Sequence, residues 1–321
     1  MKQTKWKFLF LMICSFLIGC KKGELPVTPP NNGDLVTNSV DMSSNYAYQV
    51  YFDLSSNSNK GSNLKTNWDL GISCKLGSSE VILNTSKLMF AAAILDRTFD
   101  QIVDTTGFGT SKITDESNGQ SDKLALFGHS LFIIDKGMNE LGIHLGFFKL
   151  EIIENSATEF KAKFANVDGT NEELVTLQKN DAYNFLFVNW SNGLSTVVVE
   201  PPKSEWDLVF TQYVHIFYEP EFTPYLVTGC LTNSHETKAI EVVDKAFEEI
   251  NLGYAESQFF TNDRDVLGYD WKLFDGSNYT INPDKIFIIK DEEGFYYKLR
   301  FIDFYNESGE KGNPTFEFLR L

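Results

Sequence analysis

The sequence predicts an all-β protein built from two similar antiparallel β domains, each with one short helix. Three observations support this fold class. The 321 residues include 28 Phe and 13 Tyr, which are enriched in strands. Several segments alternate apolar and polar residues with a period of two, as half-buried antiparallel strands do. The same landmarks also occur twice in the same order, which indicates an internal repeat.

The first element is an export signal rather than part of the fold. Three basic residues open the chain, namely Lys2, Lys5 and Lys7. The apolar run 8–18 is too short to span a bilayer, which takes about 20 residues, but it fits a secretory signal peptide. It leads into Gly19-Cys20, which resembles a bacterial lipobox. We expect residues 1–19 to be removed and Cys20 to carry lipid; an ordinary signal peptide with a chance Cys is the alternative.

Residues 20–40 are expected to form a lipidated tether. The stretch contains Pro26, Pro29 and Pro30 and has few apolar side chains to bury. We therefore expect it to be an extended, solvent-exposed linker. No later segment has the 18 or more uncharged apolar residues of a membrane helix. The lipid would then be the only membrane attachment.

The remaining chain divides into two copies, residues 41–180 and 181–321. Each copy holds an early strand, a Trp-Asp segment that leads to an Asn, an acidic and aromatic segment, and a late aromatic strand. In the first copy these are Tyr51-Phe52, Trp68-Asp69 to Asn84, Leu95–Ile102 and Phe132–Glu154. In the second copy they are Leu186-Phe187, Trp206-Asp207 to Asn233, Val243–Ile250 and Phe287–Asp303. A short helix is expected around Phe99 and around Phe247.

The late segments predict hairpins. Apolar and charged residues alternate at 148–152 and again at 297–301, which places Lys149 and Lys298 on the face opposite the apolar side chains. The turn at 291–294 ends in a Gly, which suits a hairpin. Residues 315–321 would form a last strand.

The second copy carries an aromatic insertion. Trp68 and Asn84 are 16 positions apart, whereas Trp206 and Asn233 are 27 apart. The additional residues lie within 213–225, a stretch that contains Tyr213, His215, Phe217, Tyr218, Phe222 and Tyr225.

The charge balance excludes some partners. The chain has 44 acidic and 28 basic residues, a net charge of −16, and loss of residues 1–19 would leave 25 basic residues and a charge of −19. Such a protein lacks the basic surface that nucleic acids require and would be repelled by anionic lipid.

No enzyme motif is present. The sequence contains no GxSxG, HExxH or P-loop motif, and no zinc or calcium spacing. We therefore expect a protein that is not an enzyme. Cys74 and Cys230 remain after Cys14 and Cys20 are assigned to the leader and the lipid, and they could pair after export.

The landmarks resemble those of the HmuY-like family of Bacteroidetes lipoproteins, some of which capture haem. The matching residues are Tyr51-Phe52, Trp68-Asp69, Leu83-Asn84 and Gly146 to Leu150, and then Trp206-Asp207, Thr232-Asn233 and Gly294 to Leu299. The resemblance implies a β-rich fold, an outer-membrane lipid anchor and cooperation with a TonB-dependent transporter. Trp68 and Trp206 also have a structural explanation as core anchors, with Asp69 and Asp207 accepting from backbone donors at strand ends.

Haem would need an axial ligand such as imidazole, thioether or phenolate. The resemblance favours His129, which precedes the Phe132 strand, while His215 lies among the aromatic residues of the insertion. Met138 and Tyr213 are reserve candidates. An ordinary hydrogen-bonded or surface His is the alternative for each, as it is for His144 and His235.

The sequence is therefore consistent with two functions. The first is a lipid-anchored protein that binds haem or another iron-bearing ligand. The second is an all-β surface lipoprotein that serves as an interaction or accessory module and binds no small molecule. A glycosidase would need paired carboxylates, and nothing marks such a pair.

Overall fold

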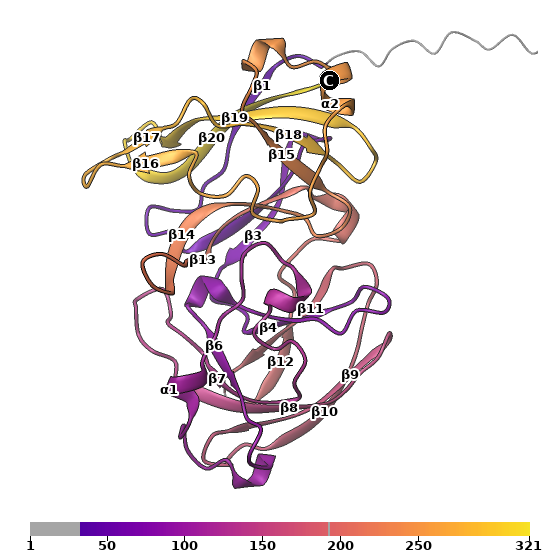
Figure 1. Cartoon of the computed structure of the whole chain (residues 1–321), viewed down its shortest axis with the longest axis vertical. Helices are drawn as coiled ribbons and strands as arrows, with labels where there is room; N and C mark the ends of the chain where they lie inside the picture. Colours follow the sequence, from indigo (N-terminus) through magenta and orange to yellow (C-terminus); the bar gives the residue numbers. More distant parts are fainter. Residues whose placement is uncertain (1–32, 192) are drawn as a thin grey trace, which may run out of the picture. The chain divides into compact units, whose positions relative to one another are not determined.

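The computed structural model describes residues 33–191 and 193–321, which form two β-sandwiches (Figure 1). The expected signal peptide and Cys20 lie outside these residues. The expected tether extends too far, because Val36–Ser39 form strand β1 and pair with Thr315–Phe318. Val36 packs against the core and Val40 is buried. No helix in the described ranges is long and apolar enough to cross a membrane.

The first sandwich joins a five-stranded sheet to a four-stranded sheet. The five strands, in sheet order, are β10 (Glu173–Gln178), β9 (Glu159–Asn166), β8 (Phe147–Asn155), β7 (Leu131–Asp135) and β6 (Phe90–Ala93). The four are β12 (Leu194–Val197), β11 (Phe185–Trp190), β4 (Leu70–Ser73) and β5 (Val81–Leu83). Apolar residues of both sheets meet in one core, which includes Ile72, Phe148 and Trp190.

The second sandwich has the same composition. Its five-stranded sheet contains β1, β20 (Lys311–Arg320), β19 (Tyr296–Tyr305), β18 (Ile286–Lys290) and β15 (Lys238–Val242). Its four-stranded sheet contains β14 (Thr223–Thr232), β13 (Leu208–Phe217), β2 (Tyr48–Asp53) and β3 (Ser58–Leu64). Phe52, Phe210 and Phe316 lie in its core. A separate hairpin is formed by β16 (Lys272–Phe274) and β17 (Tyr279–Ile281).

Residue 180 does not separate these sheets. Strand β2 pairs with β13, so residues before 180 complete the second sandwich. Strand β11 pairs with β4, so residues after 180 complete the first. Residues 33–321 form one compact unit.

The predicted all-β class with short helices is confirmed. The two α-helices are α1 (Phe108–Ser111) and α2 (Leu252–Glu256). They begin a few residues after the expected positions, where single 3-10 turns occur at Phe99–Gln101 and Phe247–Glu249. Further 3-10 turns lie at Thr85–Lys87, Ser121–Lys123 and Lys203–Glu205.

The same contacts surround both Trp-Asp segments. The backbone N–H of Asp69 donates to the Val188 carbonyl at 2.8 Å, and that of Asp207 donates to the Phe52 carbonyl at 2.9 Å. The Asn84 amide donates to the Trp68 carbonyl, and the Asn233 amide donates to the Trp206 carbonyl. Phe52 therefore occupies the place of Val188, one residue later than the sequence match to Phe187 indicated.

The aromatic insertion forms the outer part of a long hairpin. Strands β13 and β14 are ten residues each and pair along their whole length, from Leu208 opposite Thr232 to Phe217 opposite Thr223. Figure 1 shows these strands in orange, and β2 lies between β13 and β3 in the same sheet.

Candidate functional site

His129 lies at the wall of a surface cavity of about 550 Å³. One side of the cavity is the segment 75–81, which joins β4 to β5, and the other is the segment 124–129, which leads into β7. The His129 ring stands edge-on to Phe132, the second residue of β7, with 6.5 Å between ring centroids. The loop before β7 thus presents an imidazole to a space of ligand size.

The walls of this cavity combine apolar and polar groups. Leu76 and Phe127 are apolar side chains left largely exposed. The Asn155 amide nitrogen donates to the Ser79 carbonyl at 2.9 Å, while its side-chain oxygen is buried without a partner. Lys75 adds a positive charge to the lining.

His215 lies elsewhere and does not line this cavity. It stands on β13 opposite Tyr225, with ring centroids 4.9 Å from Phe217 and 5.0 Å from Tyr269. The tip of the same hairpin exposes several aromatic rings, namely Phe217, Tyr218, Phe222 and Tyr225. The two histidines expected as haem ligands are thus on separate surfaces.

The other candidate ligands are also dispersed. Met138 bridges to His144 in a short irregular ladder, and the His144 ring contacts the Asp135 carboxylate at 2.7 Å. His235 lies 3.2 Å from Glu292, and burial lowers the pKa of His235. Tyr213 is buried, and its burial raises the pKa of the phenol well above the usual value.

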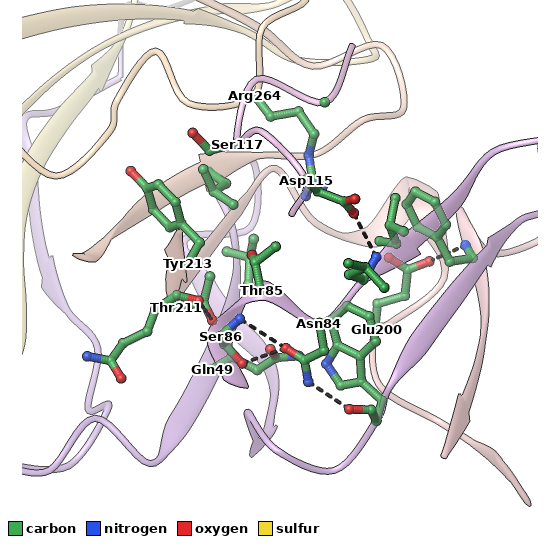
Figure 2. A pocket seen from close by; sticks show the side chains of 18 of the residues that line it. Gln49, Asn84, Thr85, Ser86, Asp115, Ser117, Glu200, Thr211, Tyr213 and Arg264 are labelled. Atoms are coloured by element: carbon green, nitrogen blue, oxygen red, sulfur yellow. Dashed lines mark hydrogen bonds between the residues drawn. The ribbon is translucent and has the colours of Figure 1, made fainter. Parts of the chain in front are cut away.

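A second cavity, of about 100 Å³, lies where the two sandwiches meet (Figure 2). Trp68, just before β4, and Trp206, just before β13, both line it. Each indole packs edge-on against an aromatic ring of the strand that pairs with its own Trp-Asp strand, Phe187 of β11 for Trp68 and Tyr51 of β2 for Trp206, with 4.8 Å between centroids in both cases. Both indole N–H groups are buried without a partner among the described residues.

Two loops, at 117–120 and 263–265, meet at this cavity. The Ser117 hydroxyl donates to the Asp265 carboxylate at 2.5 Å, and the Gln120 amide donates to Asp263 at 2.9 Å. The backbone N–H of Arg264 donates to the Asn118 carbonyl at 3.0 Å. Arg264 thereby lines the cavity on a loop that is held by the 117–120 loop.

Two buried carboxyls also line the internal cavity. Asp115 accepts from the backbone N–H groups of Leu83 at 2.6 Å and Ala125 at 2.7 Å. Glu200 accepts from the backbone N–H groups of Asn184 at 2.7 Å and Phe185 at 2.9 Å. Burial raises the pKa of both carboxyls to about 7.

Sequence reasoning missed Asp115, Glu200 and Arg264. A charged residue next to an apolar run would have been a signal for Glu200, which follows three valines, whereas Asp115 lies in a polar stretch and has no such signal. Arg264 has no such signal, because 261–265 reads as a polar loop.

Within the described ranges, no group of three or more His, Cys, Asp or Glu side chains is placed to hold a metal ion. Cys74 and Cys230 are free, buried thiols. Cys74 follows β4 in the first sandwich and Cys230 lies in β14 of the second. They do not pair.

Fold and sites together define an all-β protein of two sandwiches whose candidate sites are cavities. A family model described as HmuY protein matches residues 45–318, and the chain belongs to this family. The family that the landmarks indicated is thereby confirmed, while the division into two tandem copies stays a prediction. No curated protein matches the chain.

Solved structures of two relatives resemble the chain over nearly its whole length. An apo HmuY analog from Tannerella forsythia is 10% identical, with a TM-score of 0.33, over 90% of this chain and 98% of that one. Apo PinO from Porphyromonas gingivitis is 10% identical, with a TM-score of 0.29, over 89% of this chain and 97% of that one.

Proposed function

We propose that the protein is a cell-envelope lipoprotein that captures haem or another iron-bearing ligand, with His129 as the iron ligand. Membership of the HmuY family supports this role, and the observation that carries it is the position of His129. His129 lines a cavity of about 550 Å³, within the roughly 300–1,000 Å³ typical of small-molecule sites. Leu76 and Phe127 supply apolar surface for a porphyrin face, and Lys75 supplies a cation for a carboxylate.

The cavity favours a single protein ligand to the iron. His129 is the one His among its lining residues, which include no Met, Tyr or Cys. A single imidazole leaves the iron five-coordinate, as in globins and peroxidases. Capture by His215, with the aromatic rings around it, is the competing arrangement. Neither arrangement includes a catalytic step, so we infer a binding protein rather than an enzyme.

Haem titration followed by the Soret band tests this proposal. We expect a saturable shift for the wild type and for His144→Ala, a matched control with an exposed imidazole. His129→Ala should lose the shift and His215→Ala should keep it. If only His215→Ala loses the Soret shift, the haem site lies at the β13–β14 hairpin instead. If the wild type shows no saturable shift, the protein does not bind haem.

We further propose that Cys20 carries the lipid and anchors the protein in the outer membrane. Its position directly after Gly19 at the end of an apolar run supports this. Two or more acyl chains give stable anchoring, at about 0.8 kcal/mol per buried CH₂. Cys20→Ser should abolish labelling by a palmitate analogue and release the protein from the membrane fraction. Unchanged labelling and fractionation would reject the assignment.

A second function, an interaction module, is favoured by the exposed aromatic tip of the β13–β14 hairpin. Aromatic side chains are enriched at protein interfaces. We propose that this tip contacts a TonB-dependent transporter that receives the ligand. Replacing Phe217, Tyr218 and Phe222 by Ser should leave the Soret titration unchanged and weaken co-purification with the transporter. Equal co-purification would reject this contact.

We also propose that the two Trp-Asp segments descend from one duplicated unit. The repeated hydrogen bonds of Asp69 and Asp207, and those of Asn84 and Asn233, support this origin. In the folded protein each unit lends its early strand to the other sandwich.

A further inference from the structure

The tip of the β13–β14 hairpin combines aromatic rings with carboxylates. Residues 217–223 are all exposed, and the three aromatic side chains among them are between 40% and 57% exposed. Two acidic residues, Glu219 and Glu221, lie in the same turn. The whole hairpin, residues 208–232, contains no Lys or Arg. The tip is therefore both apolar and negatively charged.

The two carboxylates of the tip have no counterion. Glu219 and Glu221 form no ion pair among residues 33–191 and 193–321. A partner that covered the tip with apolar groups alone would remove both charges from water without pairing them, which is unfavourable. A partner that fits this surface must therefore supply cations.

Contacts with the first sandwich hold the tip in position. The Tyr218 hydroxyl donates to the Glu116 carboxylate at 2.5 Å, and Glu116 is also paired with the Lys123 ammonium at 3.5 Å. The Tyr218 ring stands edge-on to the Phe222 ring, with 6.1 Å between centroids. Side chains that are already ordered lose less conformational entropy on binding, and this favours the tip as an interaction surface.

We propose that the hairpin tip is the docking site for a protein surface that presents arginine side chains. A guanidinium group stacks on aromatic rings and forms paired hydrogen bonds with carboxylates, so one type of residue satisfies both features of the tip. A lysine ammonium supplies the charge but not the planar stacking surface. An anionic membrane is disfavoured as the partner, because the chain has a net charge of −16 and the tip itself is acidic.

This inference rests on the interaction function proposed above and specifies the chemistry of the partner's surface. Two acetylated and amidated peptides of equal length test it, one of alternating Gly and Arg and one of alternating Gly and Lys. Each peptide is titrated into ¹⁵N-labelled protein at fixed ionic strength. The backbone amide signals of residues 217–223 should shift saturably with the Gly-Arg peptide, and the Gly-Lys peptide should bind several-fold more weakly. Added salt should weaken binding of both peptides.

Variants separate this site from the general acidity of the protein. Glu219→Gln combined with Glu221→Gln should weaken binding of the Gly-Arg peptide about two- to tenfold, as the loss of two exposed ion pairs would. The matched control is Glu307→Gln combined with Glu310→Gln in the turn between β19 and β20, where both glutamates are also exposed. This control should bind like the wild type. Phe222→Leu keeps an apolar side chain but removes a ring, so it should reduce the preference for Arg over Lys.

Several results would overturn the proposal. These are the absence of a saturable shift at residues 217–223 in the wild type, equal shifts in the turn at 306–310, and unchanged affinity when the tip glutamates are replaced. Equal affinity for the two peptides would overturn the assignment to arginine. Phosphatidylcholine vesicles that perturb the tip signals when the peptides do not would indicate a membrane contact instead. Specific peptide binding without co-purification of the transporter would reject only the transporter as the partner.

Discussion

Asp69 and Asp207 occupy matching places but have different side-chain partners. Each carboxylate accepts a backbone N–H from a neighbouring strand, that of Trp190 at 2.6 Å and that of Leu54 at 2.9 Å. Asp69 is also paired with the Lys87 ammonium, with both side chains 2% exposed. Asp207 has the Thr237 hydroxyl at 3.4 Å in that position, and burial raises its pKa to about 7.

This difference predicts unequal effects for the same substitution. Asp69→Asn keeps an acceptor for Trp190 but leaves the Lys87 ammonium buried without a counterion, which costs about 3–5 kcal/mol in such sites. Asp207→Asn keeps an acceptor for Leu54 and removes no partner of a cation, so we expect a change below about 1 kcal/mol. Urea unfolding of both variants measures the free energies. Similar losses in the two variants would contradict this account.

Part of this arrangement was predictable from the sequence. Trp68 and Trp206 are buried and the Asp that follows each accepts from backbone, as the sequence predicted. The partner Lys87 was not predictable. It lies in a polar turn at 85–87, and only the tertiary fold brings its ammonium back to Asp69.

At the scale of elements, the long hairpin is held by a close backbone approach. The backbone N–H of Cys230 donates to the Gly268 carbonyl at 2.9 Å. A Cβ at the preceding Gly229 would overlap this same carbonyl and would lie 3.0 Å from the Tyr269 Cα. Only a glycine at 229 lets the 268–269 loop contact strand β14.

We therefore predict that Gly229→Ala destabilises the protein by about 1–3 kcal/mol, as overpacking generally does. Gly109→Ala is the matched control, because Gly109 lies in α1 and nothing stands within 4 Å of the added methyl group. That variant should be neutral or slightly stabilising. Thermal unfolding monitored by circular dichroism compares the two, and equal melting temperatures would exclude the steric explanation.

The strands were more predictable from the sequence than the turns that pack on their outer faces. The alternation at 148–152 and 297–301 correctly placed the apolar residues in the cores. Lys149 and Lys298, however, are buried, since the 3-10 turns at Phe99 and Phe247 cover the second face. The Lys298 ammonium donates to the Phe247 and Ile250 carbonyls, and Lys149 does the same at Phe99 and Ile102. A strand pattern reports alternation but not which faces other elements cover.

At the scale of the whole molecule, the exchange of early strands makes the two sandwiches interdependent. A fragment that ends at residue 180 lacks β11 and β12, and a fragment that begins at 181 lacks β1, β2 and β3. Each would expose a sheet edge and one side of a core. We predict that neither fragment folds alone, whereas residues 33–321 unfold in one cooperative transition. Dispersed amide NMR spectra from either fragment would contradict this.

The exchange could not be deduced from the repeat. The early strands present similar alternating apolar residues, Val50 and Phe52 in β2 and Leu186 and Val188 in β11. Either β2 or β11 could pair with either of the strands that follow the Trp-Asp segments, β4 and β13. Strand pairing depends on the alternation of apolar and polar side chains, which the two early strands share. The connecting segments decide the outcome, and their paths are not encoded in local pattern.

Three buried carboxyls predict that stability falls as pH rises. Burial raises the pKa of Asp115, Glu200 and Asp207 to about 7 in the folded protein. Between about pH 4 and pH 7 the folded state therefore holds protons that the unfolded chain releases, so each increase in pH favours unfolding. We expect a higher melting temperature at pH 5.5 than at pH 8 at fixed ionic strength. Asp207→Asn should flatten this dependence, and a melting temperature that rises toward pH 8 would refute the assignment.

Strand β1 has a consequence for the order of folding. Its partner is β20, and Val36 lies opposite Phe318, which is 282 positions further along the sequence. A chain emerging from its N-terminus would present β1 first and its only sheet neighbour last. Contacts of such long sequence separation form slowly. The outermost strand of the second sandwich must therefore stay without its partner until β20 has also emerged, so this sheet cannot be completed during the synthesis of the segments in between.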